Sequence, residues 1–205
     1  MIRVGLLGTG RIGRLHAETI ASHSESTLYA VSDIDSGSAN ELAVQYGALL
    51  KSSEEIISDP NVDAILIATS TDTHSDFIEK ASLAGKSVFC EKPVDLSLSR
   101  AKECLKKVSA ANNPIMIGFN RRFDPNFAQL KKSLDDKEIG KSELLTITSF
   151  DPAPPPVSYV KTSGGLYRRY NPPDVFTYET GGGACLLYTS PSPRDATLSR
   201  MPSSA

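Results

Sequence analysis

The sequence predicts an α/β fold in which a parallel, doubly wound sheet is followed by the beginning of a second domain. Three observations support this prediction: strand and helix patterns alternate over residues 1–118, a glycine-rich turn opens the first helix, and a Lys-Pro corner closes a later strand. Alternating strands and helices are typical of parallel sheets, because a helix returns the chain between neighbouring strands. In such sheets a ligand binds at the carboxyl ends of the strands.

The expected elements follow from the spacing of apolar residues. Strand patterns fall at about residues 2–8, 27–33, 63–69, 86–91 and 114–118. Helical patterns fall at about residues 11–23, 36–46, 73–84 and 96–111. The strands are apolar on both sides, as in Ala64–Ala68, because helices cover both faces of such a sheet. Residues 48–50 predict one more short strand, with a helical turn after Ser53.

The pattern changes after Gly118. Residues 119–125 predict a loop that carries functional groups, and a helix follows to about Asp136. Residues 142–150 alternate like a strand, which we expect to open a second sheet.

A dinucleotide fingerprint, Gly-Thr-Gly-Arg-Ile-Gly, stands between the first strand and the first helix. Gly8 permits the tight turn, Gly10 lets the backbone approach a pyrophosphate, and Gly13 lets helix and strand pack closely. The helix N-terminus then directs free N–H groups at the phosphates. The alternative, a glycine turn without a nucleotide, is disfavoured by this strand–turn–helix setting. We therefore expect a Rossmann domain whose cofactor contacts include Gly8, Gly10, Arg11, Ile12 and Gly13.

An acidic residue, Asp33, ends the second predicted strand, twenty residues after Gly13. A carboxylate there accepts hydrogen bonds from the adenine ribose hydroxyls and repels a 2′-phosphate. No arginine or lysine stands at positions 34–36 to hold such a phosphate. The sequence therefore favours NAD over NADP.

A candidate catalytic lysine, Lys92, lies in the tripeptide Glu-Lys-Pro that closes the strand at 86–91. An ammonium group at a strand end can lie beside a bound cofactor, and Pro93 restricts the backbone of this corner. The alternative is a surface lysine that leaves a strand. The fingerprint upstream favours the functional interpretation, so we assign Lys92 as a catalytic group.

The composition excludes several classes of partner. The chain has 205 residues, 40% of them hydrophobic, and a net charge of −2, which is typical of a globular protein and gives no electrostatic reason to bind nucleic acid or an anionic membrane. No apolar run is long enough to span a bilayer, and the first strand begins at Ile2, so we expect no signal peptide. The cysteines and histidines show no pairing or metal spacing. We expect a cytoplasmic protein without a metal.

These motifs, in this order, resemble the Gfo/Idh/MocA oxidoreductases. Within that family, the segments Asn-Arg-Arg-Phe-Asp-Pro-Asn and Asp-Pro-Ala-Pro-Pro-Pro are similar to those of the inositol 2-dehydrogenases. The resemblance covers residues 1–168. It rests on the fingerprint at residues 8–13 and on residues 14–16, 32–33, 68–74, 91–93 and 118–124.

The resemblance implies a Rossmann domain followed by an α+β domain with a large, mostly antiparallel sheet, and a homo-oligomer of such chains. It implies NAD-dependent oxidation of a ring hydroxyl of a cyclic polyol, myo-inositol, to a ketone. Lys92 would lie near substrate and nicotinamide, and the histidine of a downstream Asp-x-x-x-His motif would remove the hydroxyl proton. The remaining cofactor-binding positions that it implies are Thr69, Ser70, Thr71, His74, Glu91, Asn120 and Arg121.

Two of these assignments have structural alternatives. His74 is equally explained as a helix-capping neighbour, and a solvated charged loop is the alternative for residues 120–121. His16, in the first helix, is interpreted as a packing residue.

The resemblance ends near Arg168, and no histidine follows His74. We interpret residues 119–168 as the truncated start of the second domain, and residues 169–205 as a disordered tail produced by a frameshift and adapter sequence. Without its histidine base and its sheet, the chain is expected to bind NAD weakly or not at all in stable form, and to lack activity. Two alternatives stay open: another sugar or polyol as substrate, and a non-catalytic NAD-binding regulatory module.

Overall fold

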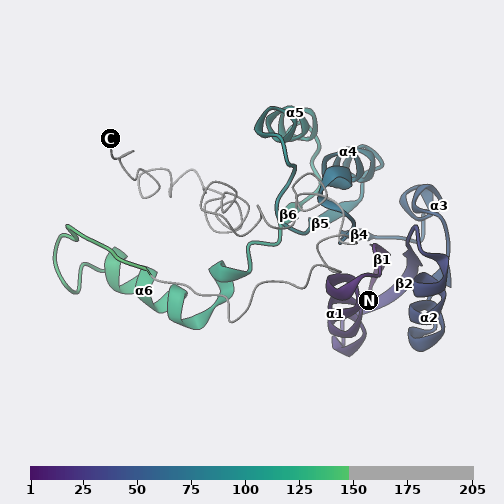
Figure 1. Ribbon diagram of the computed structural model, residues 1–205, viewed down its shortest axis with the longest axis horizontal. Coiled ribbons are helices and arrows are strands. Elements are labelled where there is room, and N and C mark those ends of the chain that lie inside the picture. The colour runs from purple at the N-terminus through teal and green to yellow at the C-terminus, as the bar shows by residue number, and fades with distance from the viewer. Residues whose placement is uncertain (148–205) are drawn as a thin grey trace, which may run out of the picture.

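The computed structural model describes residues 1–147, and its centre is a parallel sheet of six strands in the order β3-β2-β1-β4-β5-β6 (Figure 1). All pairings between neighbouring strands are parallel. The strands are β1 (Ile2–Leu7), β2 (Ser26–Ser32), β3 (Leu49–Leu50), β4 (Ala64–Ile67), β5 (Ser87–Cys90) and β6 (Ile115–Ile117). The predicted parallel, doubly wound sheet is confirmed.

The strand order reverses beside β1, because β2 and β3 extend the sheet on one side and β4 to β6 on the other. Leu7 at the end of β1 pairs with Ile67 at the end of β4. In a doubly wound sheet a ligand binds at the carboxyl ends of the strands where the strand order reverses, which here are the ends of β1 and β4.

Within residues 1–147, six α-helices connect and follow the strands, together with two short 3₁₀ turns. The 3₁₀ turns are η1 (Thr71–Thr73) and η2 (Asn120–Phe123). The helices are α1 (Arg11–Ser22), α2 (Ser36–Tyr46), α3 (Ser53–Ser58), α4 (His74–Leu83), α5 (Leu98–Val108) and α6 (Pro125–Asp135).

The helix ends follow local sequence rules. The Asp35 side chain accepts hydrogen bonds from the backbone N–H groups of Gly37 and Ser38 and so caps α2. Ser52 and Glu55 form a capping box at the start of α3. Because short polar side chains satisfy the free N–H groups of a first turn, these helix starts could be predicted from the sequence.

Two apolar layers, one on each face of the sheet, form the core. In one layer, Leu6 and Val31 pack with buried residues of α1 and α2 such as Ala17. In the other, Leu7 packs with residues of α3, α4 and α5, such as Ile78. Figure 1 shows the same division, with α1 and α2 on one side and α4 and α5 on the other. Consecutive residues face opposite layers because side chains alternate along a strand.

The second part of the chain departs from one expectation. The predicted helix after the 119–125 loop is present as α6, which buries none of its residues and extends away from the sheet in Figure 1. The predicted strand at 142–150 is wrong for residues 142–147, which have no regular structure. A strand needs a bonded neighbour, and within the described part of the chain no strand lies beside this segment.

Other expectations fall outside the described residues. These include positions 148–150 of the predicted strand, the segment to residue 168 and the tail at 169–205, so the boundaries at 118 and 168 stay predictions. Cys90 and Cys104 are buried free thiols, and Cys185 lies outside. Over residues 1–147 no helix is both long and apolar enough to cross a membrane.

Candidate dinucleotide and active site

Two glycines of the fingerprint, Gly8 and Gly13, occupy positions that tolerate no side chain. A Cβ atom on Gly13 would lie 2.0 Å from the carbonyl oxygen of Gly8, so α1 packs directly on the turn. Gly8 has a φ of +96°, and a Cβ there would lie 2.4 Å from the carbonyl oxygen of Ala68 after β4. The two glycines thus draw β1, α1 and the end of β4 together.

Gly10 differs from both, because a Cβ on it would meet nothing within 4 Å. It is the N-cap of α1, and no side chain caps this helix. The positive end of the helix dipole at this N-terminus is the kind of site that binds a pyrophosphate. Arg11 is exposed and Ile12 half-buried in this turn. The observed backbone fits a dinucleotide.

The carboxylate of Asp33 is held at the end of β2 by the fingerprint itself. Its Oδ2 accepts hydrogen bonds from the Thr9 backbone N–H at 2.5 Å and from Thr9 Oγ1 at 3.0 Å. Its Oδ1 accepts a bond from the Asp35 backbone N–H at 2.9 Å. Each carboxylate oxygen can accept more than one bond, so this fixed group retains capacity for ribose hydroxyls.

A basic residue that sequence reasoning missed lies in the same region. Nη2 of Arg14, in α1, donates to Ser38 Oγ at 3.0 Å and to Glu41 Oε2 at 2.8 Å, both in α2. Ser38 Oγ in turn lies 3.0 Å from Thr9 Oγ1. Positions 34–36 hold no basic residue, whereas Arg14 reaches this region from α1, because α1 and α2 meet in the folded chain.

Lys92 follows β5 after one intervening residue, Glu91, and β5 pairs with β4 in the sheet. The Lys92–Pro93 peptide bond is cis. The side chain is half-buried, and its ammonium group has no hydrogen bond or ion pair within residues 1–147. Among groups at the carboxyl ends of the strands, it is therefore a cation that is available to a ligand.

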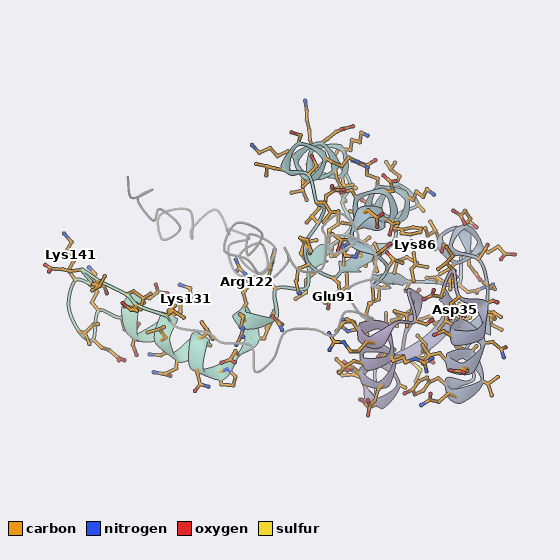
Figure 2. All side chains as sticks on the ribbon, viewed as in Figure 1. Asp35, Lys86, Glu91, Arg122, Lys131 and Lys141 are labelled. Carbon is orange, nitrogen blue, oxygen red and sulfur yellow. The ribbon has the colours of Figure 1, made fainter. Side chains whose placement is uncertain are left out.

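Glu91 is bound to the first helix. Its Oε1 lies 2.8 Å from Nε2 of His16, and the exposed side-chain fractions are 19% and 18%. The His16 ring also makes an edge contact with Phe89. Burial raises the pKa of Glu91, but the hydrogen bond and charge of His16 outweigh burial, and the pKa lies below its usual value. Figure 2 shows Glu91 on the side of the sheet toward Arg122 and η2.

His74 joins two loops at the same end of the sheet. It is 2% exposed, with Nδ1 at 2.7 Å from the Pro93 carbonyl oxygen and Nε2 at 3.1 Å from the Thr69 carbonyl oxygen. The next residue, Ser75, donates to the Val94 carbonyl oxygen at 3.2 Å. Because both ring nitrogens already have backbone partners, this geometry favours a positioning role for His74 over direct cofactor contact.

The other predicted positions fall into two groups. Thr69, Ser70 and Thr71 are half-buried at the end of β4, and Thr69 Oγ1 bonds Thr73 Oγ1 at 2.7 Å. Asn120 and Arg121 are exposed in η2, which follows β6, and the Arg121 guanidinium lies over the Phe127 ring at 5.4 Å. All of them follow carboxyl ends of strands.

No group of three or more acidic, histidine or cysteine side chains in residues 1–147 could hold a metal ion. Comparison with protein families identifies the family of this chain. Residues 2–119 match the model of an oxidoreductase family with an NAD-binding Rossmann fold. The chain belongs to the Gfo/Idh/MocA family.

Members of the Gfo/Idh/MocA family with named activities resemble this chain along its first 168 or so residues. It is 47% identical over 167 residues to an inositol 2-dehydrogenase of Rhizobium meliloti, which covers 82% of this chain and 51% of that protein. It is 42% identical over 168 residues to a myo-inositol 2-dehydrogenase of Thermotoga maritima, which covers 81% and 50%.

A solved structure agrees with the Gfo/Idh/MocA assignment. The crystal structure of a myo-inositol dehydrogenase from Corynebacterium glutamicum superposes with a TM-score of 0.72 at 38% identity, covering 82% of this chain and 51% of that chain. This chain therefore spans about half the length of the relatives that it matches.

Proposed function

We propose that this chain carries the dinucleotide-binding half of an NAD-dependent dehydrogenase that oxidises a ring hydroxyl of myo-inositol to a ketone. The observation that supports this most directly is Lys92, an ammonium group without a hydrogen bond or ion pair in the described residues, at a strand end of a sheet that also carries the fingerprint. The inositol dehydrogenases among its relatives supply the substrate class. We infer a homo-oligomer for the complete enzyme.

The chemistry assigned to Lys92 is electrostatic. NAD, when bound, supplies the acceptor for the hydride. A cation near the reacting hydroxyl stabilises the negative charge that develops on its oxygen as the proton leaves. Lys92 is fit for this role because no carboxylate of residues 1–147 forms an ion pair with it.

NAD is proposed over NADP because carboxylates surround the expected ribose site. Asp33 lies at the end of β2. The Asp35 carboxylate accepts hydrogen bonds from the first-turn backbone N–H groups of α2, which are therefore not available to a phosphate. A 2′-phosphate would meet both negative charges, whereas ribose hydroxyls can donate to Asp33.

No histidine within residues 1–147 is free to accept the proton of the reaction. The sequence has three histidines, and each is engaged: His16 with Glu91, His74 with two backbone carbonyls, and His23 with the Glu25 N–H. We propose that the 205-residue chain therefore binds NAD without oxidising the polyol at a useful rate.

Two measurements test this function. NADH binding is followed by nicotinamide fluorescence, and myo-inositol-dependent formation of NADH by absorbance, each with wild-type chain and Lys92→Gln. We expect NADH binding by both proteins and no turnover by either. Turnover by the wild-type chain at a normal enzymatic rate would refute the proposal that it lacks a proton acceptor. Absence of NADH binding would refute the proposed cofactor site.

A non-catalytic NAD-binding module is the second candidate, because all three histidines are engaged. The same assays on the enzyme extended to the length of its relatives separate the two. Inositol-dependent turnover by the extended enzyme would support the inositol dehydrogenase. Turnover with another sugar or polyol only would assign a different substrate. NADH binding without turnover would support the non-catalytic module.

A further inference from the structure

The Arg14 side chain lies between two helices at the edge of the expected ribose site. Its contacts with described residues use Nη2 alone, which bonds Ser38 at 3.0 Å and Glu41 at 2.8 Å. The donors on Nε and Nη1 have no protein partner in residues 1–147. A guanidinium carries five N–H donors, so it retains a set that suits a phosphate group.

A continuous hydrogen-bond chain joins this guanidinium to Asp33. Arg14 Nη2 bonds Ser38 Oγ, Ser38 Oγ lies 3.0 Å from Thr9 Oγ1, and Thr9 Oγ1 donates to Asp33 Oδ2 at 3.0 Å. The cation and the carboxylate that is expected to meet the ribose hydroxyls therefore border the same small region, although they come from different elements.

Negative charge dominates this region. Asp33 faces the ribose position, Asp35 covers the first turn of α2, and Glu41 pairs with Arg14. Glu41 is 70% exposed and Arg14 41% exposed, so the pair is weak and a ligand can exchange for it. The Arg14 guanidinium is thus balanced by Glu41, while Asp33 repels any phosphate that approaches.

We infer that Arg14 is a latent binding group for a 2′-phosphate and that Asp33 and Glu41 together keep it unused, so cofactor choice depends on three residues and not on Asp33 alone. This inference deepens the proposed function and rests on its dinucleotide site. Removing the charge of Asp33 eliminates the repulsion, and removing the charge of Glu41 releases the guanidinium.

The test compares NADPH and NADH binding in the full 205-residue chain. Four proteins are compared: the wild type, the single variant Asp33→Asn, the double variant Asp33→Asn/Glu41→Gln, and a triple variant that adds Arg14→Gln to the double variant. Asn at position 33 keeps an acceptor for the Thr9 N–H. The chain has no tryptophan, so nicotinamide fluorescence is read without energy transfer from that residue. A control for net charge carries Glu18→Gln in place of Glu41→Gln. Glu18 is an exposed residue of α1, the helix that also carries Arg14.

We expect Asp33→Asn/Glu41→Gln to bind NADPH roughly tenfold more tightly than Asp33→Asn, as one freed charge-assisted contact predicts. Adding Arg14→Gln to this double variant should remove that gain. The same addition should change NADH affinity by less than about twofold, because it removes no charged contact to a 2′-hydroxyl. Thermal unfolding of each variant verifies that it is folded.

Unchanged NADPH affinity on Arg14→Gln, with NADH still bound, would overturn this inference and leave the proposed function intact. An equal gain from Glu18→Gln would also overturn it, since net charge alone would then explain the effect. Wild type that binds neither cofactor would overturn the proposed function and the inference with it.

Discussion

Nε2 of His16 lies 2.8 Å from Oε1 of Glu91, and this contact joins the fingerprint helix to the strand end that carries Lys92. Both side chains are mostly buried, and the neighbouring Phe89 ring contacts the imidazole. The element expected to hold the pyrophosphate and the residue next to the candidate catalytic lysine are therefore physically connected. His16 packs, as predicted, but it also bonds a residue of the Glu-Lys-Pro motif.

His16→Ala should destabilise the fold by about 1–3 kcal/mol at neutral pH, because it leaves a buried carboxylate without its partner. The pKa of Glu91 should rise in the variant, since burial then acts without the hydrogen bond of His16. Urea unfolding at pH 7 measures the loss. His23→Asn, at an exposed histidine, is the control and should change stability by less than about 0.5 kcal/mol.

The same pair predicts a pH dependence. The lowered pKa of Glu91 means that its ionised form stabilises the native state above pH 4.5, the usual value, and that this contribution is lost as pH falls through the lower folded pKa. The stability difference between wild type and His16→Ala should therefore shrink in acid. A difference that stays constant from pH 7 to pH 3 would contradict this linkage.

Substitution of two fingerprint glycines by alanine should affect different properties, the stability of the fold at Gly13 and the binding of NADH at Gly10. Gly13→Ala should cost about 1–3 kcal/mol or more, because its Cβ would lie 2.0 Å from a backbone oxygen. Gly10→Ala meets no atom within 4 Å, so it should preserve the melting temperature and weaken NADH binding by obstructing the pyrophosphate. Thermal unfolding and nicotinamide fluorescence are compared for both variants. Equal destabilisation by the two would contradict the assignment.

The Lys51–Asp59 pair should stabilise the fold at neutral pH and lose this effect in strong acid. Lys51 Nζ lies 2.5 Å from Asp59 Oδ2, and this hydrogen bond lowers the pKa of Asp59 to about 2. Its contribution is present above the ordinary value of 3.8 and is lost as pH falls toward 2. Lys51→Met should lower the unfolding temperature at pH 7 and make little difference at pH 2. Lys131→Met, in an exposed i,i+4 pair of α6, is the matched control.

His74→Ala should destabilise the chain by about 2–4 kcal/mol, since it removes a buried ring and the partner of two carbonyl groups. Lys92→Gln, at the residue directly before Pro93, should change stability by less than about 0.5 kcal/mol, because its ammonium has no hydrogen bond or ion pair within residues 1–147. Urea denaturation distinguishes them. Equal losses would contradict the positioning role of His74.

Sequence patterns predicted most of the first domain because its determinants are local. The apolar runs, the fingerprint and the helix caps each depend on neighbouring residues, and the observed elements agree with the predicted ones to within a few residues. The strand predicted at 142–150 depended on pattern alone. It is wrong for residues 142–147 because a strand is stabilised by a partner, which spacing does not supply.

The sequence by itself determined the family, the doubly wound sheet and the glycine turn, since these follow from short-range periodicity and from an ordered set of motifs. Only the tertiary structure decided that Arg14 reaches Ser38, that His16 binds Glu91 and that His74 binds the Pro93 carbonyl. These contacts join residues 19 to 75 positions apart. Their geometry is set by how helices pack on the sheet, and no local pattern encodes it.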